Sequence, residues 1–330
     1  MRFLHLADTH LGMALPLQQR KPGWRRGHDI IAAYYRALAP ALRGDVDVVI
    51  HSGDLFDRSQ PPGQVIDIAV KPLRQIADAG VPVVIVPGNH ERSNFPGGLL
   101  FQHPLIHLLN IPRTAAVEVD GVRAAFSGFG FLREEAAARF PQMIDATGWR
   151  SVAAHVRVLV SHQLFAGARV GNHVFRSGAD VVDLAGIPTE FDYVAAGHVH
   201  PHQVLSHPSK PGLRIAYAGS PERMSYNEAE ETKGVICGHF TQQGATFRFC
   251  PLAVRPLARL RVIIAGPGDA IAAAERISDF LAAQPDGAMV NVRVIDPERL
   301  CAPLPSWDEH RQRFAELIVQ IKAPQCCHNE

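Results

Sequence analysis

Eight polar residues with metal-binding or acid–base side chains follow short apolar runs of the sequence. They are two aspartates, one asparagine and five histidines: Asp8, His10, Asp54, Asn89, His90, His162, His198 and His200. Carboxylate, amide and imidazole groups bind divalent metal ions. Two such ions about 3.5–4 Å apart polarise a phosphoryl group and lower the pKa of a bound water. The pattern therefore indicates a dinuclear metal centre that hydrolyses phosphoesters.

A dinuclear centre needs a bridging carboxylate and further ligands on each ion, and Asp54 is expected to be the bridge. Two sets of three residues are expected to complete the shells: Asp8, His10 and His200 on one ion, and Asn89, His162 and His198 on the other. His198 and His200 lie two residues apart, so a regular strand would point both to one face. A lone histidine at a strand end is more often structural, and the hypothesis therefore depends on the complete set.

The apolar runs before these residues are short and continuous, as in strands buried on both faces. They span residues 2–7, 46–51, 81–86, 157–160 and 191–196. Helical patterns at 29–42 and 65–79 separate the first three runs. Strands that alternate with helices predict an α/β layered fold, and such sheets build their sites at the carboxyl ends of the strands.

The later part of the chain has a different pattern. Residues 117–126 read as a hairpin whose Asp120-Gly121 pair predicts a type I′ turn. The strands predicted at 213–218 and 235–240 suggest a second, more antiparallel sheet. Residues 257–264, 269–283 and 288–295 then read as a β-α-β unit, which indicates a small separate domain.

Composition restricts the class of protein. The 330 residues are 47% hydrophobic and 20% charged with a net charge of +1, which excludes a disordered chain. Five cysteines without a CxxC pair predict reduced thiols and a cytoplasmic location. The sequence predicts no membrane span, and the early Asp8 argues against a signal peptide.

The order of the motifs resembles that of calcineurin-like metallophosphoesterases, and within them the SbcD-type DNA-repair exonuclease subunits. The matching segments are 5–12 (HLADTHLG), 53–57 (GDLFD), 87–91 (PGNHE), His162, 197–200 (GHVH), 217–223 (YAGSPER) and 228–234 (EAEETKG). The resemblance covers about residues 1–240. It implies a two-sheet α/β sandwich with a small C-terminal α+β cap domain.

The resemblance also implies the roles of individual groups. The two divalent ions would be Mn²⁺, with Mg²⁺, Fe²⁺ and Zn²⁺ as alternatives. His90 would not bind metal but would stabilise or protonate the leaving oxygen. Asp57, where archaeal and eukaryotic relatives tend to have histidine, would orient the site from outside the ligand shell.

Three regions are predicted: residues 1–254 as the metallophosphoesterase domain, 255–300 as the cap, and 301–330 as a tail. The tail is predicted to contain an amphipathic helix at about 307–322, because Ser306 to Glu309 form a capping box and apolar residues recur from Phe314 to Ile321. This helix would pack on the cap or dock an SMC-like coiled-coil ATPase, the partner implied by the resemblance. A homodimer is the other assembly implied.

The substrate hypothesis rests on charge as well as on the resemblance. Residues 16–43 carry a net charge of +5, and Arg25 and Arg26 are candidates for contacts with the DNA backbone. The alternative is an arginine-rich, solvated helix start. Residues 255–330 carry nine basic and ten acidic side chains, without an obvious basic stripe for DNA.

Three functions are compatible with these features of the sequence. The first is a DNA exonuclease or endonuclease in DNA repair that hydrolyses backbone phosphodiesters with metal-activated water. The second is a phosphoesterase for small phosphoesters or nucleotides, whose metal chemistry would be the same. The third is a non-catalytic scaffold, which ranks last because a degenerate copy would have lost ligands and all seven are present.

Overall fold

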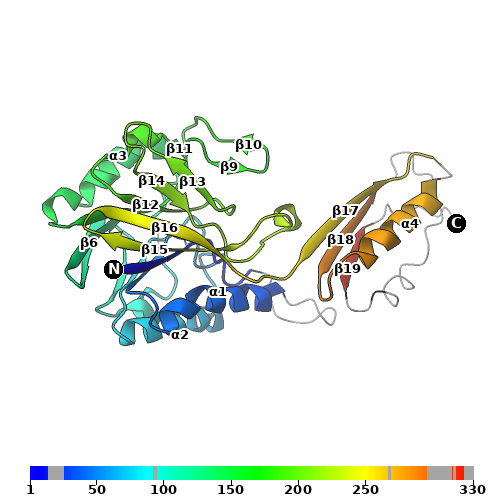
Figure 1. Ribbon diagram of the computed structural model, residues 1–330, viewed down its shortest axis with the longest axis horizontal. Coiled ribbons are helices and arrows are strands. Elements are labelled where there is room, and N and C mark those ends of the chain that lie inside the picture. Colours follow the sequence, from blue (N-terminus) through cyan, green and yellow to red (C-terminus); the bar gives the residue numbers. More distant parts are fainter. Residues whose placement is uncertain (14–25, 92–94, 267–268, 296–313, 315–316, 323–330) are drawn as a thin grey trace. The chain divides into compact units, whose positions relative to one another are not determined.

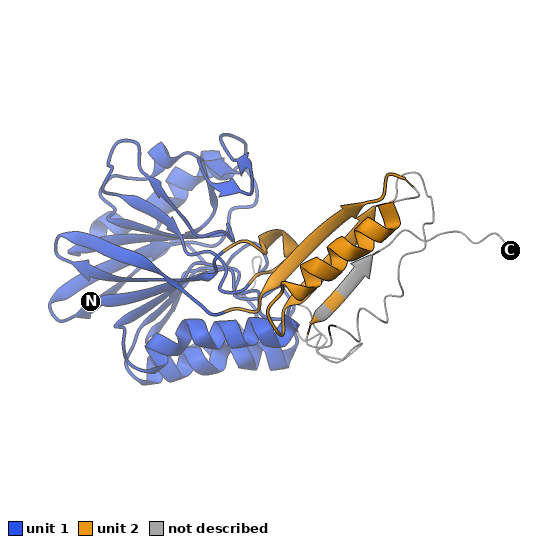
Figure 2. Cartoon of the chain, turned by 45° about the vertical axis from the view of Figure 1, so that its right-hand side comes forward, with its two compact units in different colours: residues 1–18, 25–222, 232–253 blue, residues 19–24, 223–231, 254–330 orange. Residues whose placement is uncertain are grey.

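The computed structural model describes residues 1–13, 26–91, 95–266, 269–295, 314 and 317–322 (Figure 1). The chain divides into two compact units, which Figure 2 colours separately. Unit 1 contains residues 1–18, 25–222 and 232–253, and unit 2 contains 19–24, 223–231 and 254–330. No helix within the described residues has both the length and the apolar character needed to cross a membrane.

The first sheet of unit 1 has six strands in the order β16-β15-β1-β2-β3-β4. Their bounds are β1 Arg2–Leu6, β2 Val48–His51, β3 Val83–Ile85, β4 Ile106–Leu108, β15 Gly234–Thr241 and β16 Gly244–Pro251. Strands β1 to β4 are parallel, while β15 pairs antiparallel with β1 and with β16. The parallel order places the carboxyl ends of β1, β2 and β3 at one edge.

The second sheet also has six strands, in the order β13-β14-β12-β7-β6-β5. Their bounds are β5 Arg113–Val119, β6 Val122–Gly128, β7 Val156–His162, β12 Tyr193–Gly197, β13 Gln203–Ser206 and β14 Arg214–Tyr217. Strands β6, β7, β12 and β14 are parallel. The β5–β6 hairpin turns at Asp120 and Gly121, both with positive φ, which confirms the predicted type I′ turn.

The main core of unit 1 lies between the two sheets. Phe3 and Ile50 of the first sheet pack there with Phe126, Val158 and Tyr193 of the second. Two helices, α1 (Arg26–Leu42) and α2 (Gly63–Asp78), cover the other face of the first sheet, and α3 (Ala136–Ala146) covers the second (Figure 1). The unit is therefore a four-layer α/β sandwich, in agreement with the predicted fold class.

Short elements complete unit 1. They are the strands β8 Leu164–Phe165, β9 Arg169–Val170, β10 His173–Val174 and β11 Val181–Val182, and the 3-10 turns η1 Gly98–Phe101, η2 Trp149–Ser151 and η3 Leu184–Gly186. A further turn, η4 (Tyr226–Glu228), belongs to unit 2.

Unit 2 is a three-stranded parallel sheet with one helix. Its elements are β17 Leu257–Ile263, α4 Asp269–Ala282, β18 Met289–Ile295 and β19 Ile318–Lys322, with β18 in the centre. Ile277 and Leu281 of α4 pack on Val262 and Val292, which form a core of their own. The predicted β-α-β unit is confirmed.

Two predictions of secondary structure are wrong. The strands at 213–218 and 235–240 do not share a sheet, because β14 pairs parallel with β12 and β15 pairs with β1. A tail helix was predicted at about 307–322, but residues 318–322 of that range form the strand β19, which pairs with β18. The β-branched residues Ile318, Val319 and Ile321 favour a strand that can complete a sheet. Residues 307–313 of that prediction lie outside the described residues.

Candidate metal centre

The first part of the site consists of two loops that follow β1 and β2. The backbone pairs them beyond the sheet: Asp8 N donates to Gly53 O at 2.9 Å, and His10 N donates to Asp54 O at 3.0 Å. Leu11 N continues the pairing to Leu55 O at 2.9 Å. Asp8 and His10 are thereby fixed relative to Asp54 by backbone bonds rather than by their side chains.

The backbone of the site is unusual. Six non-glycine residues in the described part of the chain have positive φ, and four of them are predicted ligands: Asp8 (53°), His10 (43°), Asp54 (52°) and His198 (92°). Such conformations cost energy and persist where the surroundings impose them. Because of these backbone conformations, successive side chains do not alternate as they would in a strand, and they can point toward the same place.

His198 shows the consequence of this backbone. Strand β12 ends at Gly197, and His198 therefore does not continue the strand. The expectation that His198 and His200 share one face of a regular strand is wrong. The backbone N–H of His198 instead donates to the Asp8 carboxylate at 3.0 Å, which links the second sheet to the first.

One group of donors surrounds His10. Its Nε2 lies 3.1 Å from His200 Nε2 and 3.7 Å from Asp54 Oδ2. Donor atoms of Asp8, His10 and His200 all lie within 4.8 Å of one another. The three residues predicted for one metal shell are therefore brought together, with Asp54 beside them.

A second group surrounds Asn89, whose Oδ1 lies 3.0 Å from His162 Nε2 and 2.9 Å from His198 Nδ1. His162 Nε2 also lies 3.3 Å from Asp54 Oδ2. His162 Nδ1 donates to the carbonyl of Ser52 at 2.8 Å, which directs Nε2 to the centre. Asp54 thus lies between the two groups, as a bridging ligand would.

The charges of the centre fit divalent cations. Asp8 and Asp54 are 0% and 2% exposed, and no lysine or arginine among the described residues forms an ion pair with either. Burial raises the pKa of Asp8. Burial would also raise the pKa of Asp54, but the adjacent His162 holds it below its usual range. Buried carboxylates of this kind need a positive charge nearby.

The protonation states of the imidazoles also fit a site for divalent cations. Burial lowers the pKa of His10 and of His198 to about 3, so both rings are neutral at pH 7 and offer a lone pair. Burial would also lower the pKa of His162, but Asp54 and Asp8 raise it to about 9. A proton on His162 thus supplies part of the positive charge that metal ions would supply. The donor set fits two divalent ions.

His90 lies at the border of the two groups. Its backbone N–H donates to Asp54 Oδ1 at 2.9 Å, and its Nδ1 donates to the carbonyl of Asp57 at 2.6 Å. Its Nε2 lies 3.9 Å from Asp54 Oδ2, and the side chain is 35% exposed. Asp57 also places Oδ1 3.9 Å from His10 Nδ1. These contacts match the predicted positions of an accessible His90 and an orienting Asp57.

Close approach explains two glycines of the motifs. A Cβ at Gly88 would overlap the Asp54 carboxylate, and one at Gly197 would overlap the carbonyl of Ser52. Only glycine fits at these two positions, because a neighbouring motif occupies the space that any side chain would need.

Glu91 is a residue of the site to which the sequence analysis assigned no role. Its side chain is fully buried, and its two oxygens accept hydrogen bonds from Phe56 N at 2.7 Å and Gly88 N at 2.6 Å. It therefore holds the loop after β2 against the loop after β3. The only signal in the sequence was its place in the PGNHE segment.

We expect Glu91→Gln to lower the free energy of unfolding by roughly 1–3 kcal/mol, because the amide turns one N–H donor toward a backbone N–H and leaves that group unsatisfied. Urea denaturation of the metal-free protein measures the change. Glu190→Gln, at an exposed position, is the matched control. Equal stability of the two variants would contradict the role of Glu91 in holding the loops after β2 and β3 together.

The predicted basic contacts are only partly described. Arg25 lies outside the described residues. The guanidinium of Arg26 is within 3.1 Å of Asp29 and 3.4 Å of Glu222, and the side chain is 15% exposed. Arg26 thus has an internal role, and its contact with substrate stays a prediction.

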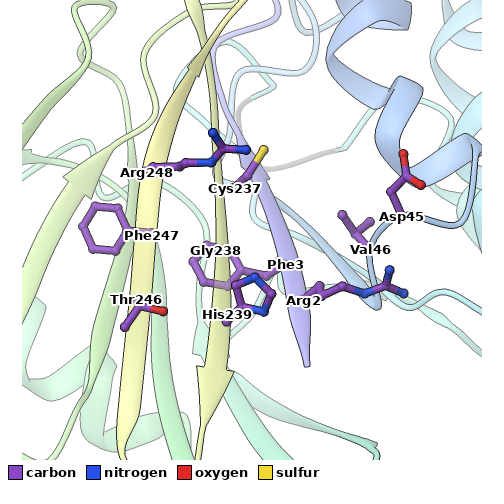
Figure 3. Close-up of a pocket in the computed structure, with 10 residues that line it drawn as sticks. All are labelled: Arg2, Phe3, Asp45, Val46, Cys237, Gly238, His239, Thr246, Phe247 and Arg248. Atoms are coloured by element: carbon purple, nitrogen blue, oxygen red, sulfur yellow. The ribbon is translucent and has the colours of Figure 1, made fainter.

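Several hollows lie in the described part of unit 1. One, of about 600 Å³, adjoins the centre and is lined by Gly88, Asn89, Ile111, Phe131 and Arg133 among others. Another, of about 400 Å³, lies over β1, β15 and β16 (Figure 3). It contains none of the predicted site residues.

Two stacked sheets with a carboxylate–imidazole cluster at their strand ends define a metal-dependent phosphoesterase. Residues 1–202 match the family described as calcineurin-like phosphoesterase. The chain belongs to this family.

Comparison with individual proteins shows which members of this family the chain resembles. The chain is 30% identical over 247 residues to "DNA double-strand break repair protein Mre11" of Methanopyrus kandleri, which covers 71% of this chain and 51% of the relative. It is 31% identical over 279 residues to the Mre11 protein of Haloferax volcanii, covering 84% and 58%. It is 26% identical over 266 residues to the D subunit of the nuclease SbcCD of Bacillus subtilis, covering 71% and 65%. The chain therefore spans about half to two thirds of the length of these relatives.

Among solved structures, the NAD nucleotidase of Haemophilus influenzae aligns with a TM-score of 0.43 at 15% identity, covering 77% of this chain and 50% of that one.

Proposed function

We propose that this chain is a DNA-repair nuclease that hydrolyses backbone phosphodiesters with two divalent metal ions. The observation that carries the proposal is the convergence of six donor side chains from both sheets around Asp54, in a chain that resembles Mre11 and the SbcD component of SbcCD over most of its length. A cytoplasmic location, predicted from the reduced cysteines, suits such a substrate.

In this proposal, Asp8, His10 and His200 would hold one ion, Asn89, His162 and His198 would hold the other, and Asp54 would be shared between them. Bound metal ions supply Lewis acidity toward a phosphoryl oxygen and lower the pKa of water. The chain fixes the ligands through backbone bonds and the Ser52 carbonyl, which orients His162. His90 donates its Nδ1–H to the Asp57 carbonyl, so it would donate a proton from Nε2 to the leaving oxygen as an imidazolium, with both ring nitrogens protonated, and become neutral.

The resemblance to the SbcD-type subunits favours Mn²⁺ as the metal. The donor set combines carboxylate and amide oxygens with imidazole nitrogens and includes no thiolate, a mixture that can bind Mn²⁺ as well as other divalent ions. Mg²⁺, Fe²⁺ and Zn²⁺ are the alternatives that a metal titration compares.

Two partners besides DNA belong to the proposal: an SMC-like coiled-coil ATPase and a second copy of the chain. The relative from Bacillus subtilis is itself named as one component of a complex. The tail helix predicted to dock the ATPase is replaced at 318–322 by β19, so those residues do not provide a helical docking face.

The substrate is tested with purified protein on single-stranded DNA, double-stranded DNA and a small chromogenic phosphodiester. We expect DNA hydrolysis that EDTA stops and Mn²⁺ restores. Good turnover of the small ester without DNA cleavage would instead support a phosphoesterase for small molecules. Absence of turnover on all three would support a scaffold.

A further inference from the structure

Lys233 is buried inside unit 1, although lysine is almost never fully buried unless its charge is paired. The residue is 2% exposed and directly precedes β15. An ammonium group inside a protein costs free energy unless hydrogen-bond acceptors surround it. The acceptors of Lys233 therefore indicate what the buried charge stabilises.

His200, one of the predicted ligands, lies in a loop between two strands. Strand β12 ends at Gly197 and β13 begins at Gln203, so residues 198–202, the His200 loop, belong to neither. Val199 packs in the apolar core beside the second sheet and anchors the start of this loop. The position of His200 depends on contacts made by the rest of the loop.

The ammonium group of Lys233 provides such a contact. Its Nζ donates to Ser220 Oγ at 2.9 Å and to the carbonyl oxygen of His200 at 3.4 Å. The same carbonyl accepts the backbone N–H of Ser220 at 3.0 Å. Hydrogen bonds from an ionised donor are stronger than those between neutral groups. Lys233 thus contacts the His200 carbonyl directly and also holds the residue that provides its other donor.

The segment after β14 packs closely against the His200 loop. Gly219 has a φ of +76°, and a Cβ there would lie 2.5 Å from the carbonyl oxygen of His200 and 2.8 Å from His202 N. His202 Nδ1 donates to the carbonyl of Tyr217 at 2.8 Å. The end of β14 and the turn after it therefore support the second half of the loop.

We propose that Lys233 is a positioning residue of the metal centre, which fixes His200 through its carbonyl oxygen. Groups behind a metal ligand fix the direction of its lone pair and thereby set the affinity for the ion. Among the described residues, the hydrogen bonds of Lys233 reach His200 and not the group around Asn89. Its effect should therefore fall on one ion, the one held with Asp8 and His10. This role rests on the proposed function, because it requires that two ions occupy the centre.

The test is a Mn²⁺ titration of the metal-free protein, in which EPR measures the free ion and no catalysis is needed. We expect Lys233→Met to weaken one of the two ions by about tenfold or more and to change the other little. Lys210→Met is the matched control, because Lys210 Nζ also donates to a backbone carbonyl, that of Phe191 at 2.8 Å, outside the donor groups. Equal weakening of both ions, or the same effect in Lys210→Met, would overturn the proposal.

A milder variant keeps the proposal testable if Lys233→Met does not fold. Ser220→Ala removes the hydroxyl that accepts from Lys233 and keeps the backbone donor to His200. We expect it to weaken the same ion by about two- to tenfold, as the loss of one hydrogen bond would. Unchanged affinity for both ions in Ser220→Ala, together with a folded protein, would overturn the proposal.

Amide hydrogen exchange of the metal-free protein distinguishes positioning from a general effect on stability. The Ser220 N–H is protected by its bond to the His200 carbonyl, so Lys233→Met should speed its exchange. Exchange of the Ser52 N–H, which donates to the carbonyl of Leu6 at 3.0 Å, should stay constant. Unchanged exchange at Ser220 would overturn the proposal. A wild-type protein that binds both ions in this way but hydrolyses no DNA would contradict the nuclease function alone.

Discussion

Replacing Asp54 with asparagine is expected to lower kcat/KM by at least about 1000-fold, because the centre loses several kcal/mol of metal-dependent stabilisation. Asp54 Oδ1 already accepts the N–H of His90, and Oδ2 lies within 3.3 Å of His162 Nε2 and 3.7 Å of His10 Nε2. Asp8 lies near donors of both groups as well, but its Oδ1 is 4.0 Å from His162 Nδ1, a ring nitrogen that already donates to the Ser52 carbonyl. An amide removes the charge and can present an N–H₂ group where a ligand oxygen is needed.

This prediction is measured by steady-state kinetics over a Mn²⁺ titration. Asp67→Asn, at an exposed position of α2, is the matched control and should keep wild-type activity. A metal-free readout accompanies it: Asp54 is the main group that raises the pKa of His162 to about 9, so an NMR titration of Asp54→Asn should show that pKa falling. Activity within tenfold of wild type would disprove the bridging role.

Replacing His90 with alanine is expected to lower kcat on DNA by about 100-fold or more while the affinity for Mn²⁺ stays nearly constant. Nδ1–H donates to the Asp57 carbonyl, so Nε2 faces the centre and can donate a proton to the leaving oxygen when the ring is protonated on both nitrogens. An alkoxide leaving group needs that proton. A p-nitrophenolate leaving group does not, so the loss should be much smaller on a p-nitrophenyl ester.

Comparison of the two substrates decides the role of His90. His239→Ala, at an exposed position of β15 outside the centre, is the control for loss of an imidazole. The same loss of kcat on both substrates would indicate that His90 orients the ligands and does not protonate the leaving group. Rescue of DNA hydrolysis by added imidazole would further support proton donation.

Local patterns were sufficient for most elements of unit 1. The apolar runs before Asp8, Asp54 and Asn89 predicted strands because short, continuous apolar runs bounded by turn residues are typical of strands buried on both faces. The glycines and polar residues that follow marked the edge where a site forms. The placement of β14 and β15 was wrong because pairing partners lie far apart in the sequence, and a run of apolar residues does not specify which sheet it joins.

The prediction of a helix in the tail was wrong for a related reason. Phe314, Leu317 and Ile321 are spaced as in an amphipathic helix, but the unpaired edge of β18 offers hydrogen bonds that an isolated helix does not. Glu91 was missed because its role depends on two backbone N–H groups, and backbone donors carry no signature in the sequence.

The sequence by itself determined which carboxylate, amide and imidazole side chains are available as ligands and in what order they follow the strands. Chemistry of this kind depends on residue identity, and identity is local. Only the tertiary structure decided that Asp8, His10, Asp54 and His198 adopt positive φ, and that β14 and β15 pair with strands of different sheets. Both depend on contacts between distant segments, because backbone strain is sustained by its surroundings and register is set by strand pairing.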